Sequence, residues 1–364
     1  MKQLNIYPRL LNSANPWCTT LEQLQELYSS EYTGAVTTRT SLLEGFPHDP
    51  SCHQYTFYNP ATFQAAHANP AGGEEQPGSL NTLGYSPVPL KDYLTFIKTI
   101  SDSLKDTPTS AETPNGRGSG TNLKPFIISI TGNVQEVIEC YRLISEHQAH
   151  VRMELAMEIN LSCPNIPGKP PPAYNSATLL AYLAALKSEI SRQLESVPPD
   201  ERPSHIKKYH VPIGIKSPPY TYRDQYQQLL NALLQSTTAE PVDLPSPVSF
   251  ITATNTLGSS LLLSPGLDGT FHHTLKSADG TSGIGGLAGA PLHPLALGNV
   301  YTIRKILSEN SSLSALQIIG VGGVENNEGY LRMRNAGADA VGVGTALGRR
   351  GLKVFKEIMD GRID

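Results

Sequence analysis

Eight short apolar runs recur along the chain, most of them followed by a segment of helical spacing, and this repeat limits the possible folds more than any other feature. The runs cover residues 10–14, 34–40, 126–132, 157–163, 212–218, 249–257, 317–324 and 340–347. In "VQEVIECYRLISEHQ", after the third run, apolar residues return every three or four positions, as in an amphipathic helix. Strands that alternate with helices pair in parallel, and eight of them can close on themselves. We therefore predict an α/β fold, a (β/α)8 TIM barrel.

An open, doubly wound sheet is the alternative arrangement for alternating strands and helices. Such sheets usually have fewer strands, and the nucleotide-binding version carries a GxGxxG turn after its first strand. The first apolar run here ends in "NSANPW". The barrel is therefore the favoured fold.

Two stretches interrupt the repeat: residues 41–124, after the second run, and residues 257–293, after the sixth. In a barrel both would rise from the C-terminal face, where loops build the active site. We expect one domain over residues 1–364, with these two insertions as lids. Within the first, residues 105–124 are rich in Ser, Thr, Gly and Pro and are typical of a surface insertion.

Composition narrows the class of ligand. The 364 residues include 28 Lys and Arg against 32 Asp and Glu, a net charge of -4, so no basic field is available for nucleic acid or an anionic membrane. The four cysteines are scattered, without the spacing of a disulfide framework or a zinc site, and we expect no metal. No signal-type start and no apolar run of about 20 residues is present. We expect a soluble cytoplasmic protein that acts on a small molecule.

Side chains at the carboxyl ends of barrel strands meet at one face, so these positions are the candidate functional residues. They are Ser13, Ala14, Arg39, Thr40, Thr131, Asn160, Cys163, Lys216, Asn255 and Thr256. The last two strands end in "GVGG" and "GVGT". Gly322, Gly323, Gly344 and Thr345 there would let backbone N–H groups approach a phosphate, at the usual phosphate site of such barrels. The alternative is that these glycines serve only tight turns.

Three kinds of side chain at this face could carry chemistry. Lys216 could stabilise negative charge developing on a ligand, unless its ammonium simply reaches the rim. Cys163, before a proline, could act as a general base through its thiolate fraction, unless it is an inert packed thiol. The amides of Asn160, Asn165 and Asn255 suit a flat substrate with carbonyl and ring N–H groups.

The segment "EINLSCPNIPGKP" closely resembles the signature of class 1A dihydroorotate dehydrogenases, the soluble FMN enzymes of pyrimidine biosynthesis. The resemblance continues, in family order, through "NSANPWCTT", "GSLNTLGY", "IGIKSPPY", "NTLGSSL", "SGIGG", "IIGVGG" and "GVGTAL". It covers nearly the whole chain. It implies an FMN enzyme that oxidises dihydroorotate to orotate.

The resemblance also implies roles for individual residues. Cys163 would take the proton from C5 of dihydroorotate while a hydride leaves C6 for N5 of FMN. The implied substrate-binding residues are Arg39, Asn81, Leu83, Gly84, Tyr85, Asn160, Asn165, Asn255 and Thr256. The implied FMN-binding residues are Ser13, Ala14, Arg39, Thr40, Asn160, Lys216, Gly285, Gly286, Gly322, Gly323, Gly344 and Thr345. Class 1A further implies a homodimer that uses fumarate, whereas a class 1B protein would need a second subunit carrying FAD and an iron–sulfur cluster.

Departures from the family pattern leave other functions open. Arg39 stands where the family has a lysine, and Tyr85 stands where a leucine is expected. Arginine keeps the charge but is longer and forked. The alternatives are a flavin enzyme acting on another dihydropyrimidine such as dihydrouracil, a flavin-binding protein that has lost turnover, and a phosphate-binding aldolase with Lys216 as its Schiff-base amine.

Overall fold

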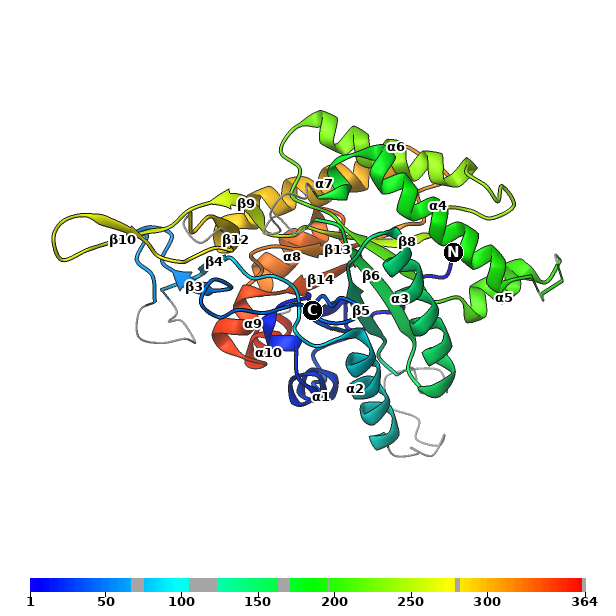
Figure 1. Ribbon diagram of the computed structural model, residues 1–364, viewed down its shortest axis with the longest axis horizontal. Coiled ribbons are helices and arrows are strands. Elements are labelled where there is room, and N and C mark those ends of the chain that lie inside the picture. The colour runs from blue at the N-terminus through cyan, green and yellow to red at the C-terminus, as the bar shows by residue number, and fades with distance from the viewer. Residues whose placement is uncertain are drawn as a thin grey trace.

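Eight parallel strands form a closed barrel in the computed structural model, which describes residues 1–66, 75–104, 123–162, 171–195, 197–198, 200–278 and 282–361, without the side chains of 207–209 (Figure 1). The sheet order is β1-β14-β13-β8-β7-β6-β5-β2, and a parallel bridge between Leu11 and Ala35 closes the ring. The strands are β1 (Leu10–Asn12), β2 (Val36–Thr37), β5 (Phe126–Ile130), β6 (Leu155–Asn160), β7 (Ile213–Lys216), β8 (Val248–Ala253), β13 (Gln317–Val321) and β14 (Ala340–Val343). Each predicted run overlaps one of them, with β6 and β8 beginning two residues and one residue earlier than predicted, and the predicted TIM barrel is confirmed.

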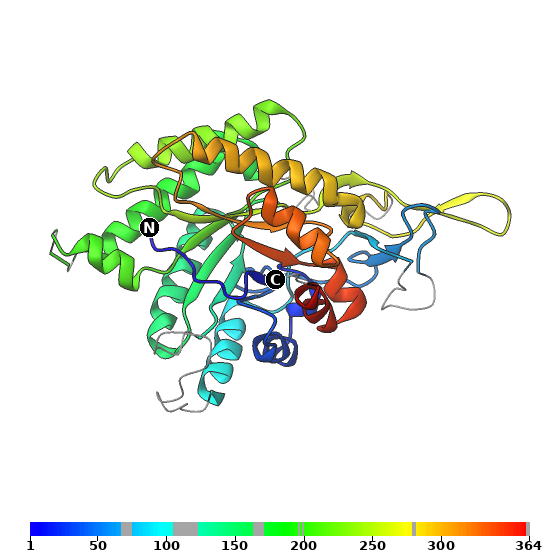
Figure 2. The same ribbon diagram turned by 180° about the vertical axis from the view of Figure 1, so that it is seen from behind.

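Helices surround the barrel on its outer side (Figures 1 and 2). They are α1 (Leu21–Ser29), α2 (Leu90–Ser103), α3 (Val134–His147), α4 (Ser176–Gln193), α5 (Arg202–Tyr209), α6 (Arg223–Thr238), α7 (His293–Ser308), α8 (Asn327–Asn335), α9 (Thr345–Arg350) and α10 (Lys353–Asp360). Local sequence fixes several starts. Asn133, for example, accepts from the backbone N–H of Gln135 and Glu136, while the Glu136 side chain accepts from the N–H of Asn133.

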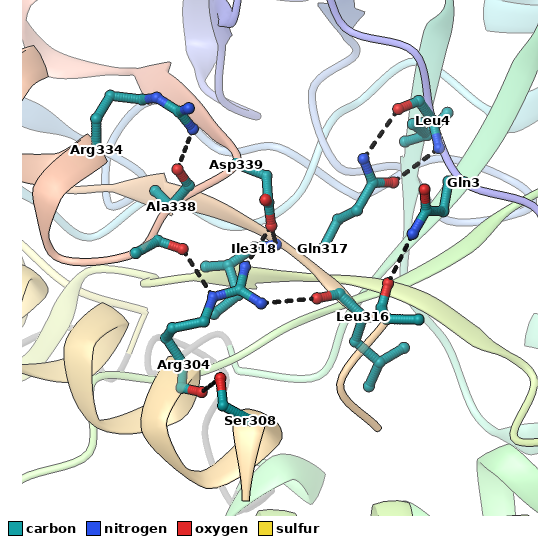
Figure 3. A network of polar contacts seen from close by, with 12 residues as sticks. Gln3, Leu4, Arg304, Ser308, Leu316, Gln317, Ile318, Arg334, Ala338 and Asp339 are labelled. Atoms are coloured by element: carbon teal, nitrogen blue, oxygen red, sulfur yellow. Dashed lines mark hydrogen bonds and ion pairs between the residues drawn. The ribbon is translucent and has the colours of Figure 1, made fainter. Parts of the chain in front are cut away.

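The N-terminal segment of the chain fills the interior of the barrel at the end where the strands begin. Leu4 and Ile6 belong to the apolar cluster inside the strands, together with Leu11, Ala35, Ile127, Ala156, Phe250, Ile319, Val321 and Ala340. The Gln317 side chain binds both backbone groups of Leu4, accepting from its N–H at 2.7 Å and donating to its carbonyl at 3.0 Å (Figure 3). Arg304 bonds to the carbonyls of Gly337 and Leu316 beside this contact. The N-terminal end of the barrel is therefore plugged, and a ligand must enter from the other end.

A second sheet lies at the C-terminal side of the barrel, and it joins the two interrupting stretches. Its order is β3-β4-β12-β9, all antiparallel, with β3 (Tyr55–Tyr58) and β4 (Gly78–Asn81) from the first stretch and β9 (Leu257–Ser260) and β12 (Gly285–Gly289) from the second. A hairpin of β10 (Leu263–Pro265) and β11 (Phe271–His273) projects from this sheet (Figures 1 and 2). Segments about 200 residues apart thus form one roof beside the strand ends.

Candidate active site

A cavity lies between the strand ends and the second sheet. The structure brings together most of the residues expected from the sequence. Those that line the cavity are Ser13, Ala14, Arg39, Thr40, Asn81, Leu83, Gly84, Tyr85, Asn160, Lys216, Asn255, Thr256, Gly322, Gly323, Gly344 and Thr345.

Three expected residues that the structure describes, Thr131, Gly285 and Gly286, do not line this cavity. Gly285 and Gly286 lie in β12 just behind it, where the Asn81 side chain donates to the Gly286 carbonyl at 3.1 Å. A side chain on Gly286 would meet Thr256 Oγ1 at 2.2 Å, so this glycine lets β12 pack closely against the lining. Cys163 and Asn165 lie outside the described residues.

Ten residues of the cavity lining were not predicted from the sequence. The additional residues are Asn15, Pro16, Trp17, Tyr55, Ser79, Thr254, Ala288, Gly289, Leu292 and Val321. One signal was available for Ser79: it lies two residues before Asn81 on one strand, so both side chains face the same way. Tyr55 reaches the site because it pairs with Asn81 across β3 and β4, a pairing without a local signal.

Two asparagine amides are held together at the cavity floor. The Asn255 Nδ2 donates to Asn160 Oδ1 at 3.1 Å and to Ser162 Oγ at 2.9 Å. The Asn160 Nδ2 donates to Thr40 Oγ1 at 3.1 Å. Because their partners fix both amides, the floor presents polar groups to a ligand in set directions.

Lys216 is buried at the end of β7, only 5% exposed, in register with Asn160 on β6 and Thr252 on β8. No described residue forms a hydrogen bond or ion pair with its ammonium, although the residue lines the cavity. Burying an ammonium without a partner is costly. The position is therefore suited to a ligand that carries or develops negative charge.

Arg39 is the second cation of the cavity. Its Nη2 donates to the Gly84 carbonyl at 3.3 Å, which tethers the loop that also carries Tyr85. Burial lowers the pKa of Arg39, yet a guanidinium stays protonated at neutral pH. With Lys216 it makes the cavity positive, since no described residue of the lining is acidic. An anionic ligand fits this balance.

The loop after β13 contains two glycines whose backbone angles and close contacts favour glycine. Gly322 and Gly323 adopt φ values of 142° and 66°, which disfavour any other residue. A side chain on Gly323 would come within 2.7 Å of the Gly289 carbonyl. His293 at the start of α7 fastens the loop, with its Nδ1 2.7 Å from the Gly322 carbonyl and its Nε2 accepting from Arg332 at 3.2 Å.

The loop after β14 lies beside it. The Thr345 hydroxyl is 2.8 Å from that of Ser79 on β4, so this strand end also contacts the second sheet. A side chain on Gly344 would meet Ser13 Oγ at 3.1 Å. The two loops form a cradle bordered by hydroxyls, at the place where such barrels usually bind a phosphate.

The thiol of Cys18, which follows the lining residues Pro16 and Trp17, is unsuited to proton transfer. Cys18 is fully buried in the short 3-10 helix Pro16–Cys18, and burial raises its pKa to about 12. It therefore stays protonated at neutral pH. Within the described ranges, no group of three or more His, Cys, Asp or Glu residues could hold a metal ion.

Comparison with known proteins decides the family. The family model described as dihydroorotate dehydrogenase matches residues 61–363. The chain belongs to the dihydroorotate dehydrogenase family. The resemblance seen in "EINLSCPNIPGKP" is thereby confirmed, and the class 1A assignment agrees with the names of the curated relatives.

Relatives with assigned names extend over almost the whole chain. A Streptococcus agalactiae protein named as a dihydroorotate dehydrogenase A (fumarate) is 26% identical over 352 residues, 96% of this chain and 86% of that protein. A Streptococcus pyogenes protein with the same name is 27% identical over 355 residues, again 96% and 86%. Dihydroorotate dehydrogenases are oxidoreductases, so the family is one of redox enzymes.

Solved structures agree on the fold. The Eimeria tenella DHODH in complex with ferulenol matches with a TM-score of 0.66 at 16% identity, over 98% of this chain and 81% of that one. The ligand-free form of the Eimeria tenella enzyme gives 0.64 at 17% identity, over 98% and 85%. Among the described residues, no helix is both long enough and apolar enough to cross a bilayer.

Proposed function

We propose that this protein oxidises dihydroorotate to orotate in pyrimidine biosynthesis, with FMN as its cofactor. This proposal is based on one cavity, in which a glycine cradle, two cations and a pair of fixed amides lie together. The glycine cradle suits a flavin phosphate, and the cations suit a flavin ring that gains electrons and an anionic substrate. The fixed amides suit a planar substrate with ring polar groups. Family membership supports the same activity.

The residues at the strand ends divide into two sets for this task. Gly322, Gly323, Gly344 and Thr345 would hold the FMN phosphate, and Lys216 would lie where the reduced ring gains negative charge. Bound FMN supplies the hydride acceptor. Gly285 and Gly286, with Ser13, Ala14 and Thr40, would pack near the cofactor, as the family resemblance implies.

Substrate binding would use the cation and the amides. Arg39 would attract the carboxylate of dihydroorotate, and Asn160 and Asn255 would bond its ring groups, since all three line the cavity. Asn81, Leu83, Gly84, Tyr85 and Thr256 would complete this side, together with Asn165. Cys163 would remove the C5 proton, because a free thiol pKa near 8.5 leaves a usable thiolate fraction at neutral pH.

We further propose fumarate as the electron acceptor and a homodimer as the working form, in the cytoplasm. The names of the streptococcal relatives support fumarate, which as a dianion suits a cavity containing Arg39 and Lys216. Steady-state turnover of dihydroorotate with fumarate, oxygen and a quinone in parallel tests the acceptor. Turnover with oxygen or quinone but not fumarate would exclude fumarate.

A second candidate is oxidation of another dihydropyrimidine, such as dihydrouracil. Arg39 donates to the Gly84 carbonyl, and the Tyr85 ring packs edge-to-face against Phe46 with ring centroids 5.8 Å apart. These two contacts shape the loop 83–85, which would lie against the substrate. Presenting the yellow protein with both compounds separates the two candidates. Turnover of dihydrouracil but not dihydroorotate would favour the second, and a colourless protein would favour neither.

A further inference from the structure

A buried carboxyl group inside the barrel has no part in the proposed reaction. Glu158 lies on β6 two residues before Asn160, so both side chains point to the barrel interior. It is 2% exposed and does not line the cavity. Both oxygens are satisfied: Ser129 Oγ donates to Oε1 at 2.9 Å and Thr252 Oγ1 donates to Oε2 at 2.6 Å.

From Glu158 a line of hydrogen bonds runs to the cavity floor. Ser129 Oγ is 2.9 Å from Thr40 Oγ1, and Asn160 Nδ2 donates to Thr40 Oγ1 at 3.1 Å. Ser129 is completely buried, and Thr40 and Asn160 are 5% and 6% exposed. Water therefore has little access to replace a member of the line.

The carboxylate sets the direction of every bond in this line. It can only accept, so the single hydrogen of Ser129 goes to Glu158. Ser129 must then accept from Thr40, which uses the single hydrogen of Thr40. Thr40 is left as an acceptor, and only the NH2 end of the Asn160 amide can meet it.

The other end of the amide agrees with this order. Asn160 Oδ1 accepts from Asn255 Nδ2 at 3.1 Å and from Ser162 Oγ at 3.1 Å. Asn255 Oδ1 in turn accepts from the backbone N–H of Thr256 at 2.8 Å. A flipped Asn160 would set its NH2 against that of Asn255 and its carbonyl against a hydroxyl without a free hydrogen. Such mismatches are costly in a buried site.

We infer that Glu158 is a positioning residue: through Ser129 and Thr40 it fixes the orientation of the Asn160 amide, and so the pattern of donors and acceptors offered to the ligand. One N–H of Asn160 Nδ2 remains without an acceptor in the described part of the chain, and Asn160 lines the cavity. This N–H selects a ring carbonyl. The inference rests on the proposed function, because dihydroorotate and orotate are the probes.

Ser129→Ala tests the line without altering any residue of the cavity lining. We expect the Kd for orotate, measured per bound flavin, to rise roughly 3- to 10-fold, which corresponds to the loss of one hydrogen bond. The rate of flavin reduction at saturating dihydroorotate should fall less than about twofold, so KM should rise while kcat stays nearly unchanged. The matched control is Ser41→Ala, since Ser41 is equally buried, lies outside the cavity lining, and its hydroxyl donates to the backbone carbonyls of Leu42 and Val88 rather than to the line. It should bind orotate like the wild type.

Glu158→Met gives a second route, because it keeps the length of the side chain but removes both acceptors, including the one that fixes the Ser129 hydrogen. The same loss of affinity is expected. Wild-type affinity in both folded, flavin-bound variants overturns the inference, as does a lowered Tm with unchanged orotate affinity, which would make the role structural. If the wild-type protein itself binds no orotate and is not reduced by dihydroorotate, the proposed function fails instead.

Discussion

Two lysines are buried in the described part of the chain, and they differ in their surroundings. Lys187 donates to the carbonyls of Ser236, Thr237 and Ala239 at 2.6–3.2 Å. The ammonium of Lys216 has no protein partner within the described residues and faces the cavity. Burial alone thus does not mark a functional lysine, and the role that we propose for Lys216 depends on its burial without a partner among the described residues.

Lys216→Met should slow reduction of the flavin by dihydroorotate about 100-fold, the usual effect of removing one group that stabilises developing charge. Stopped-flow absorbance under anaerobic conditions measures this rate. Lys187→Met is the matched control: it should lower the thermal midpoint and leave the reduction rate of the folded protein unchanged. Equal rates in the two variants would remove Lys216 from the reaction.

Arg39 supplies a positive charge and a hydrogen bond to the Gly84 carbonyl, and two substitutions separate the effects of the charge and of the bond. Arg39→Lys keeps the charge and loses the bond to the Gly84 carbonyl, so KM for dihydroorotate should rise about 3- to 10-fold. Arg39→Met loses both and should raise KM about 100-fold or more, because a charge-assisted bond is the stronger one. Indistinguishable KM values for the two variants would show that the charge is irrelevant.

Cys163→Ala tests the proposed base. FMN should remain bound, since the cofactor contacts proposed here come from other strand ends, while flavin reduction should fall by about 100-fold to 10,000-fold. Rapid-reaction spectroscopy with dihydroorotate measures the loss, and dithionite reduction serves as the positive control. Reduction by dihydroorotate at the wild-type rate would rule out Cys163 as the base.

At the scale of elements, one histidine links a helix to a barrel strand and makes stability depend on pH. His210, just before β7, has its Nδ1 3.0 Å from the hydroxyl of Tyr141 on α3. Its Nε2 is buried without a partner in the described part of the chain, so a proton there would have no acceptor. Burial, and then the positive N-terminus and Lys2, lower the pKa of His210 to about 3.

This shift predicts acid destabilisation. The unfolded chain has a histidine pKa near 6.5, so between pH 6.5 and 3 it binds more protons than the folded protein, and stability falls as pH falls. The contribution is complete above about pH 6.5 and is lost at up to about 1.4 kcal/mol per pH unit below it. Urea unfolding of wild type and His210→Gln at pH 7 and pH 5 should show a loss about 2 kcal/mol smaller in the variant. Parallel losses would contradict the assignment.

Some elements could be predicted from the sequence and others could not, for a physical reason. Barrel strands such as β5 and β8 are buried on both faces, so they appear as continuous apolar runs. The strands β3, β4, β9 and β12 are short and pair with partners far along the chain, so pairing rather than local composition forms them. Helix α2 was also missed, because it lies within the stretch 41–124 treated as irregular.

The candidate site follows the same division. Residues at barrel strand ends, such as Arg39 and Lys216, could be found because the fold dictates where strand ends meet. Tyr55, Ser79 and Gly289 belong to the roof, and their place depends on the second sheet. The line from Glu158 to Asn160 could not be predicted either, since it requires the register of neighbouring strands.

At the scale of the whole molecule, the projecting hairpin carries apolar side chains that its own chain does not cover. Leu267 is fully exposed and Phe271 is 66% exposed. Exposed apolar groups gathered on one projection often mark a contact with another protein, and the proposed homodimer would cover them. The hairpin is therefore the first place to test for the subunit contact.

Replacing both Leu267 and Phe271 with Glu should convert a dimer into a monomer, because two charges would be buried at the contact. Size-exclusion chromatography with light scattering measures the mass. The thermal midpoint of the monomer should change little through these positions, since neither side chain is buried in the chain itself. A variant that remains dimeric would place the contact elsewhere, and a monomeric wild type would exclude the homodimer.

We propose that FMN binds in the cavity between the barrel and the second sheet and accepts a hydride from dihydroorotate there. Anaerobic titration of the purified protein with dihydroorotate, followed by absorbance and by analysis of the product, tests this most directly. We expect a yellow protein whose flavin is bleached, with orotate formed in an amount equal to the flavin. A flavin that dithionite bleaches and dihydroorotate leaves oxidised would contradict the proposal.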